Sequence, residues 1–412
     1  MYLPNEKIKI IFIDIMSIPH YFDTLWGTLS DTNDLVFLFS SNDIDRKSNL
    51  RNFGEVIDFN GFNNFFSNVF NNNLIVKILN DHSVNSNQAA IITSYVNNIR
   101  KIMDFNITCI HLADKFYNYE LAPDFICKDI SGVKDVIEGK NGGYYAEAMV
   151  NERRGYQYAC VLNNKYSCGE NIVDVWAAGR YFPAWTAQGH YHLLSIKIIS
   201  NKREGREHNL FYLIFLRMIA AYNFERSNVV ICAIPPKPGQ NNRFTNIINK
   251  ISQNLNIENG LNYLYCNKDY GNNKIRGAKD REISLAGVFS LSKDSNFKGR
   301  NVVIIDDVLA SGATLKEAAK VLYEAGAATV TAFVIGINQL TSEWRNVRYI
   351  PLRCPQCGGE LNLRINNRNL MPFYGCENYP KCRYTMNYDD GYRIIKEQNI
   401  MKFIDTGEGV EF

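Results

Sequence analysis

The segment Val302–Leu315 reads VVIIDDVLASGATL, and this segment decides the fold. Four β-branched apolar residues come first, two adjacent carboxylates follow, and the next turn consists of small and hydroxyl-bearing residues. The residues TLKEAAKVLYEA at Thr314–Ala325 carry apolar side chains at helical spacing, and Gly326 follows them as a typical helix end. The segment therefore predicts a buried parallel strand, a turn and the start of a helix.

The two carboxylates, Asp306 and Asp307, fall where this strand is expected to end. Open α/β sheets bind ligands at the carboxyl edge of their strands. The loop Leu309–Thr314 then presents hydroxyls, exposed amides and a helix dipole to an anion, and Gly312 allows a close backbone approach. Adjacent carboxylates accept hydrogen bonds from vicinal hydroxyls. We therefore expect a ligand with a phosphate and a nearby diol, such as a ribose 5-phosphate; a simple helix start beside a solvated acid pair is the alternative.

Composition sets the frame for the rest of the chain. The 412 residues predict two or three domains, and 46% hydrophobic with 21% charged residues indicates folded structure. A net charge of +3 gives no general argument for nucleic-acid binding, so that argument has to come from a local patch. No apolar run reaches the ~18 residues of a membrane span, and the N-terminus lacks the layout of a signal peptide. We expect a cytoplasmic protein.

Patterns along the chain predict an α/β protein in several parts. Short apolar runs alternate with helix-length segments, which is typical of parallel sheets flanked by helices. We predict a Rossmann-like α/β domain at 1–138, a second α/β domain with an N-terminal cap or hood at 144–345, a four-cysteine module at 350–390 and a tail at 391–412. The six cysteines outside the module are scattered, and we expect buried free thiols there.

The N-terminal stretches KIIFIDIMSIPH and LVFLFSS are similar to the first and second motifs of haloacid-dehalogenase (HAD) phosphatases. In that family the first strand delivers a nucleophilic aspartate, which would be Asp14 here. The second catalytic aspartate would fall at Met16. The resemblance therefore implies an inactive relative, with Asp14 as a structural acid at a strand end.

The full string around Asp306 resembles the phosphoribosyl-diphosphate (PRPP) loop of type I phosphoribosyltransferases. The resemblance extends over roughly 227–337 and is closest to the ComF-type, competence-associated members. The sequence ICAIPPKPGQNNRFTN is similar to that family's first loop. The fold implied for the second domain is a type I phosphoribosyltransferase parallel sheet flanked by helices.

This resemblance assigns roles to individual residues. Asp306 and Asp307 would hold the ribose hydroxyls, and Mg²⁺ would accompany the PRPP. The basic segment NKIRGAKDR would form a closing loop over the diphosphate, although a solvated basic loop is the simpler interpretation. Its candidate catalytic cations are Arg276, Lys279 and Arg281. The residues expected to bind PRPP are Leu309, Ala310, Ser311, Gly312, Ala313, Thr314, Pro236, Lys237 and Arg243.

The C-terminal module spaces its cysteines as C-x₂-C-x₁₈-C-x₅-C, at Cys354, Cys357, Cys376 and Cys382. Two such pairs can surround one Zn²⁺ tetrahedrally, and a closed four-cysteine set predicts a structural rather than a catalytic metal. The metal would supply the stability that so short a segment lacks.

The module closely resembles the zinc ribbons of bacterial type IA topoisomerases, which bind single-stranded DNA. Basic and aromatic residues interleave in it, as backbone neutralisation and base stacking require. The predicted nucleic-acid contacts are Arg364, Arg368, Phe373, Tyr374, Tyr379, Lys381 and Arg383. Alternatively, the aromatic residues pack the ribbon's own core or the ribbon binds protein.

Together these features predict a PRPP-dependent transferase that moves ribose 5-phosphate to an unidentified base-like acceptor and carries a DNA- or RNA-binding zinc ribbon. A nucleic-acid-handling protein that senses PRPP or a nucleotide without turnover is the alternative. No membrane partner is expected, and assembly into a homo-oligomer stays open.

Overall fold

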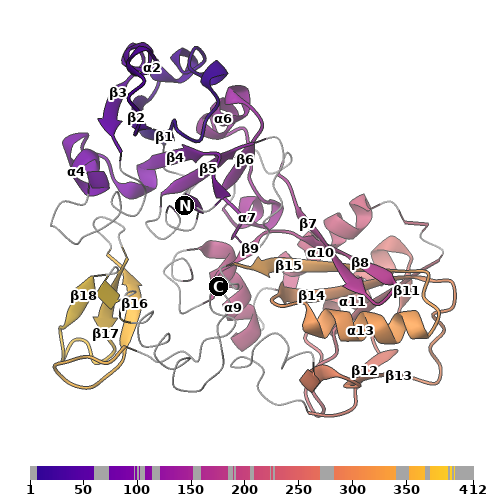
Figure 1. Cartoon of the computed structure of the whole chain (residues 1–412). Helices are drawn as coiled ribbons and strands as arrows, with labels where there is room; N and C mark the ends of the chain where they lie inside the picture. Colours follow the sequence, from indigo (N-terminus) through magenta and orange to yellow (C-terminus); the bar gives the residue numbers. More distant parts are fainter. Residues whose placement is uncertain are drawn as a thin grey trace.

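The computed structural model describes most of the chain (Figure 1). The described residues, which contain all the strands, helices and contacts given below, are 7–59, 74–96, 98–99, 102, 107–113, 121–151, 159–183, 189, 192–204, 208–222, 224–225, 228–269, 283–339, 352–366, 372–387, 390–391 and 394. No helix within these ranges is both long and apolar enough to cross a membrane.

The first sheet has six parallel strands in the order β3-β2-β1-β4-β5-β6. The order reverses between β1 and β4, which is the doubly wound arrangement of a Rossmann-like layer. All five residues of β1 are buried, as expected for a strand covered on both faces. The strands are β1 (Ile10–Asp14), β2 (Asp34–Phe39), β3 (Glu55–Asp58), β4 (Ala89–Thr93), β5 (Thr108–Leu112) and β6 (Phe125–Cys127).

Helices bury both faces of this sheet. Phe12 and Val36 face the core that contains α4, whereas Ile13 and Phe37 face the core that contains α2 and α6. Such alternation follows from the period of two in a strand. Asp43 and Asp129 cap α2 and α6 by accepting backbone hydrogen bonds. The helical segments are η1 (His20–Phe22), α1 (Gly27–Ser30), α2 (Ile44–Leu50), α4 (Leu74–Asp81), η2 (Ser86–Gln88) and α6 (Ile130–Ile137).

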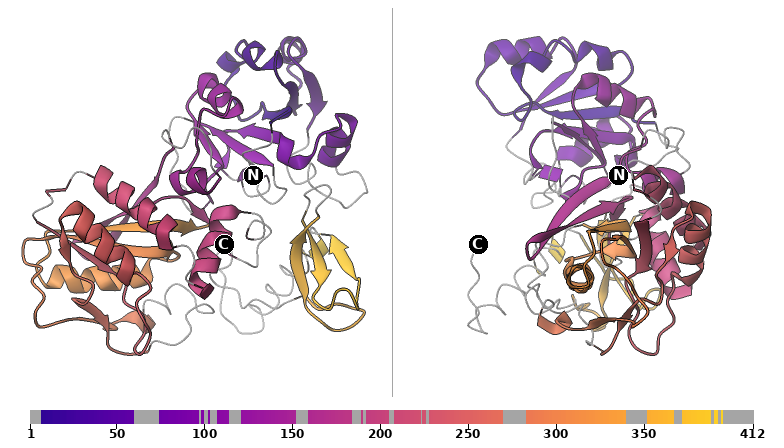
Figure 2. Two further views of the ribbon diagram at one scale, coloured as in Figure 1. Left: turned by 180° about the vertical axis from the view of Figure 1, so that it is seen from behind. Right: turned by 90° about the vertical axis from the view of Figure 1, so that its right-hand side faces the viewer.

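The second sheet has seven strands in the order β11-β10-β14-β15-β8-β7, with β9 also paired to β15. All pairs are parallel except the β7–β8 hairpin, which the sequence analysis did not anticipate. In Figure 1 and in both views of Figure 2, this sheet lies in a different part of the molecule from the first sheet. The strands are β7 (Leu162–Cys168), β8 (Asn171–Ala177), β9 (Arg180–Tyr181), β10 (Val229–Ala233), β11 (Glu258–Asn259), β14 (Asn301–Leu309) and β15 (Thr329–Asn338).

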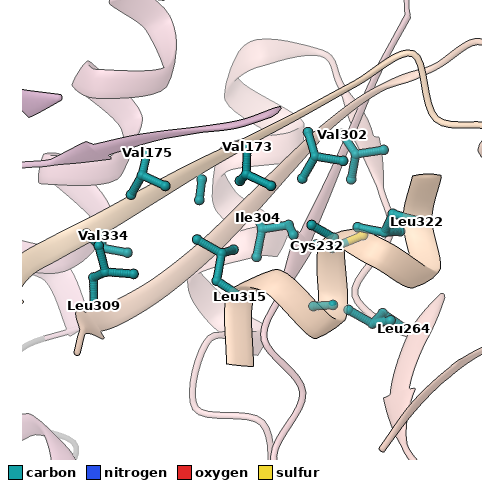
Figure 3. Close-up of a cluster of buried hydrophobic side chains, with 14 of the residues drawn as sticks. Val173, Val175, Cys232, Leu264, Val302, Ile304, Leu309, Leu315, Leu322 and Val334 are labelled. Carbon is teal, nitrogen blue, oxygen red and sulfur yellow. The ribbon is translucent and has the colours of Figure 1, made fainter. Parts of the chain in front are cut away.

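Helix α13 covers one face of this sheet, and α10 and α11 cover the other. Leu315 and Leu322 of α13 point toward Val302 and Ile304 of β14 (Figure 3). The intervening strand residues Val303 and Ile305 belong to the core shared with α10 and α11. The remaining elements are α7 (Tyr145–Val150), α9 (Leu193–Glu204), α10 (His208–Ala221), α11 (Thr245–Leu255), α13 (Ala313–Glu324) and the antiparallel pair β12 (Leu264–Cys266) and β13 (Phe289–Leu291).

The cysteine module forms a three-stranded antiparallel sheet of β16 (Leu361–Ile365), β17 (Pro372–Cys376) and β18 (Thr385–Asn387). Its buried core consists of Leu352, Leu361, Tyr374 and three of the four cysteines. The α/β class, the parallel sheets and the small C-terminal ribbon are therefore confirmed. The domain boundaries given above remain predictions.

A buried ionic cluster joins the two α/β parts of the chain. Arg180, 1% exposed, opens β9 and lies 2.7 Å from Asp124 next to β6 and 2.8 Å from Glu147 in α7. Its Nη1 also donates to the carbonyl of Ala122, and Gln339 accepts a hydrogen bond from the Ala122 amide at 2.7 Å. Burial alone would raise the pKa of Glu147, but Arg180 lowers that pKa well below its usual range.

We predict that Arg180→Met lowers the free energy of unfolding by about 3–5 kcal/mol at pH 7, because two carboxylates would stay buried without their cation. Without Arg180, burial raises the pKa of both acids in the folded variant, so the loss should be small at low pH, where the acids are protonated in both proteins, and grow as pH rises toward neutrality. Urea denaturation at several pH values measures this. Lys47→Met is the control, because its ion pair with Asp58 is exposed and should contribute less than about 1 kcal/mol. Equal losses in both variants would contradict the prediction.

Candidate functional site

The acid pair lies near the carboxyl end of β14, in the middle of the second sheet. Strand β14 continues to Leu309, so the pair lies within the strand rather than after it. Asp307 is buried, with 3% of its side chain exposed, whereas Asp306 keeps 24% exposed. Neighbouring β10 ends at Ala233, and the Ile234 amide donates to the Ile305 carbonyl at 3.2 Å. The loop 234–244 therefore leaves the sheet at the same edge as the acids.

The turn after the strand has the geometry expected of an anion-binding turn. Gly312 has φ +75°, and a Cβ there would lie 3.1 Å from the Tyr166 ring. Helix α13 begins at Ala313 without a side-chain cap at Gly312, and the Ala313 amide donates a long hydrogen bond, 3.5 Å, to the Ser311 hydroxyl within the turn. The side chains of Leu309 and Ala313 are buried, 4% and 5% exposed, so these residues can only offer backbone groups to a ligand.

Two cations from distant segments hold the acid pair. Arg243, in the loop after β10, places Nη2 at 3.2 Å from Asp306 and 2.8 Å from Asp307. Lys202 of α9 lies 3.3 Å from the other oxygen of Asp307. Sequence reasoning proposed Arg243 as a PRPP contact but missed Lys202, whose helix precedes the acids by about a hundred positions and carries no motif.

The Asp307 oxygen beside Arg243 makes no hydrogen bond to any described residue, although the ion-pair distance is short. Asp306 in turn accepts the Asp307 backbone amide at 2.8 Å. The pair thus keeps one buried acceptor oxygen, next to the more exposed Asp306, and hydroxyl donors from a ligand would satisfy it.

Burial and the neighbouring carboxylate raise the pKa of Asp306 to about 6, while Arg243 and Lys202 act in the opposite direction. A carboxylate with a raised pKa costs folding free energy wherever it is ionised. Residues arranged in this way are typical of functional sites.

We predict that Asp306→Asn raises the free energy of unfolding by about 1–3 kcal/mol at pH 8, because the variant removes one of two adjacent negative charges. The gain should appear as pH rises from about 4 to 6, the window between the ordinary pKa and the raised one. Below pH 4 the wild-type acid is protonated in both states and the difference should vanish. Chemical denaturation of both proteins across pH 3.5–8 tests this, and a destabilised variant at pH 8 would contradict it.

The other residues predicted to bind PRPP or to act in catalysis lie in the first loop and in the basic loop. Lys237 lies 2.8 Å from Asp269 and forms an ion pair with it. Pro236 is half-buried in the same loop. Arg276, Lys279 and Arg281 lie outside the described residues, so their catalytic roles stay predictions.

The four cysteines of the module converge on one point. The sulfur atoms of Cys354, Cys357, Cys376 and Cys382 all lie within 4.8 Å of one another. Cys354 and Cys382 are 3.6 Å apart, and Cys357 and Cys376 are 3.4 Å apart. Thiolates about 2.3 Å from a tetrahedral zinc are separated by about 3.8 Å, so the set fits zinc. Asn378 donates to Cys357 and, with a backbone hydrogen bond from Gly359, lowers the pKa of this thiol to about 6.

The ribbon surface brings together some of the predicted nucleic-acid contacts. Tyr379 is 62% exposed, and Lys381, Arg383 and Arg364 are exposed as well. Phe373 is half-buried, and Arg368 lies outside the described residues. The prediction for Tyr374 is wrong: its ring is 5% exposed because it packs in the ribbon core, so no base can stack on it.

Asp14 ends β1 in a closed hydrogen-bond network. It is 2% exposed and accepts from Thr93 at 2.9 Å and from Asn98 at 3.1 Å. Burial raises its pKa despite these bonds. Such an environment fits the structural role expected for Asp14, and the HAD resemblance itself stays a prediction.

Comparison with known protein families decides the identity of both C-terminal parts. A phosphoribosyl transferase domain model matches residues 218–359, and a topoisomerase DNA binding C4 zinc finger model matches residues 352–391. The chain contains a phosphoribosyltransferase domain and a topoisomerase-type zinc ribbon. The fusion expected from sequence is thus confirmed, whereas the ComF-type assignment remains a prediction.

Two curated relatives match short segments of the chain. Ribose-phosphate pyrophosphokinase 3, chloroplastic, of Oryza sativa subsp. japonica is 44% identical over 62 residues, 15% of this chain. Ribose-phosphate pyrophosphokinase 4 of the same plant is 55% identical over 42 residues, 10% of this chain. The matched segments span only 13% of either relative, so the similarity concerns a local part of those proteins.

Proposed function

We propose that the phosphoribosyltransferase domain binds Mg-PRPP and transfers its ribose 5-phosphate to a base-like acceptor, with release of diphosphate. One observation carries this proposal: a partly exposed acid pair is followed, within the same strand–turn–helix unit, by an uncapped helix start at Gly312. A single ligand with a diol and a terminal phosphate matches both halves. The names of the two plant relatives refer to ribose phosphate, which agrees with this ligand class.

In this proposal the acid pair accepts hydrogen bonds from the ribose hydroxyls, and the amides from Leu309 to Thr314 bind the 5-phosphate. The acceptor's lone pair forms a bond to C1, the bond between C1 and the diphosphate oxygen breaks, and diphosphate leaves with that electron pair. The acceptor proton passes to solvent. Asp306 and Asp307 lie where their negative charge stabilises positive charge developing on the sugar.

Mg²⁺ prefers oxygen ligands and keeps much of its water, so diphosphate and ribose oxygens would supply most of its ligands. When bound, the ion neutralises charge on the departing diphosphate. Asp306 is the partly exposed carboxylate of the acid pair and is the protein oxygen best placed to contact a hydrated ion. The basic side chains of the first loop, Lys237 and Arg243, supply further positive charge.

We predict that Asp307→Asn weakens PRPP binding by about 100-fold, because hydrogen bonds to a charged acceptor contribute about 1.5–3 kcal/mol each. Calorimetric titration with PRPP and Mg²⁺ measures binding, and diphosphate release with candidate bases measures turnover. Asp294→Asn, at an exposed acid of the same domain, is the control and should bind normally. Normal PRPP binding by Asp307→Asn would refute the diol contact. Binding without diphosphate release for any acceptor would favour a sensor.

We also propose that the zinc ribbon binds single-stranded nucleic acid. The supporting observation is the exposed group of Tyr379, Lys381 and Arg383 beside the cysteine cluster. An exposed ring can stack on a base, and the neighbouring cations can neutralise phosphates.

We predict that the double variant Lys381→Ala/Arg383→Ala weakens single-stranded DNA binding by about 10-fold at 0.1 M salt and reduces the slope of log K against log salt by about one to two units. Removal of zinc by a chelator should abolish this binding, because the ribbon core is too small to fold alone. Fluorescence anisotropy at several salt concentrations measures both effects. PRPP binding should not change, and Lys47→Ala in the N-terminal part is the matched control. If the salt slope does not change, these two cations do not contact nucleic-acid phosphates and the ribbon binds another kind of partner.

A further inference from the structure

Both described basic side chains of the loop 234–244 are engaged by carboxylates. Arg243 contacts the acid pair, and Lys237 contacts Asp269. Under the proposed function the acid pair binds the ribose hydroxyls, so Arg243 lies close to C1, the neighbouring sugar carbon, which carries the diphosphate. Arg243 and the acid pair therefore satisfy each other's charges, whereas Lys237 is neutralised by an acid outside the pair.

We propose that Arg243 is a specificity-determining residue that changes partner when the ligand binds. In this structure its guanidinium neutralises Asp306 and Asp307. A ligand that carries a diphosphate at C1 draws the guanidinium away from the acids and frees them for the ribose hydroxyls. A ribose 5-phosphate without the diphosphate offers Arg243 no replacement anion, so it has to compete with Arg243 for the same carboxylates.

The local charges allow such an exchange. Arg243 keeps 43% of its side chain exposed, so its guanidinium can turn toward a ligand without leaving a closed core. Asp307 is buried, so it needs a new partner when the guanidinium leaves, and a ribose hydroxyl supplies one. A guanidinium binds the oxygens of a diphosphate in bidentate fashion, which compensates for the lost carboxylate contacts.

The backbone around Arg243 is anchored, so only its side chain has to move. Asn242 accepts a hydrogen bond from the Phe244 amide at 2.9 Å, and its carbonyl accepts one from Thr245 at 2.8 Å. Phe244 is 1% exposed and packs in the core with α11. The guanidinium carbon lies over the ring of this fixed residue, 5.1 Å from the ring centre.

Lys202 provides an internal comparison. It also contacts Asp307, at 3.3 Å, but it comes from α9 and its ammonium lies 5.5 Å from the Tyr181 ring. It does not belong to the first loop, so the presence of a diphosphate should not decide its partner. Its contribution to binding should be the same for ligands with and without a diphosphate.

The test measures the affinity of wild type, Arg243→Gln and Lys202→Gln for PRPP and for ribose 5-phosphate, both with Mg²⁺, by calorimetry. Arg243→Gln should weaken PRPP about 10-fold and strengthen ribose 5-phosphate about threefold, so the preference for PRPP falls about 30-fold. Lys202→Gln should change both affinities in the same direction and leave their ratio within about threefold. Arg243→Lys, which keeps the charge, should retain part of the preference.

Equal weakening of both ligands in Arg243→Gln would overturn the exchange and leave Arg243 as an ordinary contact. Unchanged affinity for both ligands would overturn it as well. If wild type binds neither ligand, the proposed function itself fails. Thermal unfolding of each variant verifies that it is folded at the temperature of the titration; Arg243→Gln should unfold at a lower temperature than wild type, because the buried Asp307 loses a cation.

Discussion

The parallel pairing of β14 with β10 and β15 determines where the candidate ligand contacts lie. Ile305 aligns with Ala233 on one side and with Phe333 on the other, so the strands reach the carboxyl edge in register. Because of this register, the backbone pairing alone brings the acids of β14 and the loop after β10 to the same edge of the sheet. The buried, alternating faces of β14 hold the register, since a slip by one residue would turn Asp307 toward the opposite face.

The acid pair places two negative charges side by side, and cations from other segments of the chain neutralise them. Two carboxylates on consecutive residues repel each other and lose hydration, as the raised pKa of Asp306 reflects. Arg243 and Lys202 reduce this cost from two separate segments. A ligand that binds the acid pair has to replace contacts between the carboxylates and these cations with contacts of its own. The difference in free energy between the two sets of contacts decides which ligand binds.

Short-range patterns made much of this structure predictable. The turn and helix around Gly312 and the four cysteines depend on residues close in sequence, and they appear where they were expected, although the strand before them continues past the acids to Leu309. The β7–β8 hairpin was missed because its polar residues give no clear alternation, and Lys202 and the Arg180 cluster were missed because their partners are distant in sequence. Tyr374 was misassigned because composition alone does not tell whether an aromatic ring faces the solvent or a small core.

The cluster around Arg180 has a consequence for how this chain can be inherited. Its carboxylates come from both α/β parts, and the Ala122 amide is bonded to a side chain beyond the end of β15. A gene segment that encoded the transferase part alone would lack Asp124 and would expose a surface shaped for a missing neighbour. We therefore expect gene recombination to keep the two α/β parts in one chain. The ribbon has its own cysteine cluster and its own core, so we expect that it can be joined to other proteins.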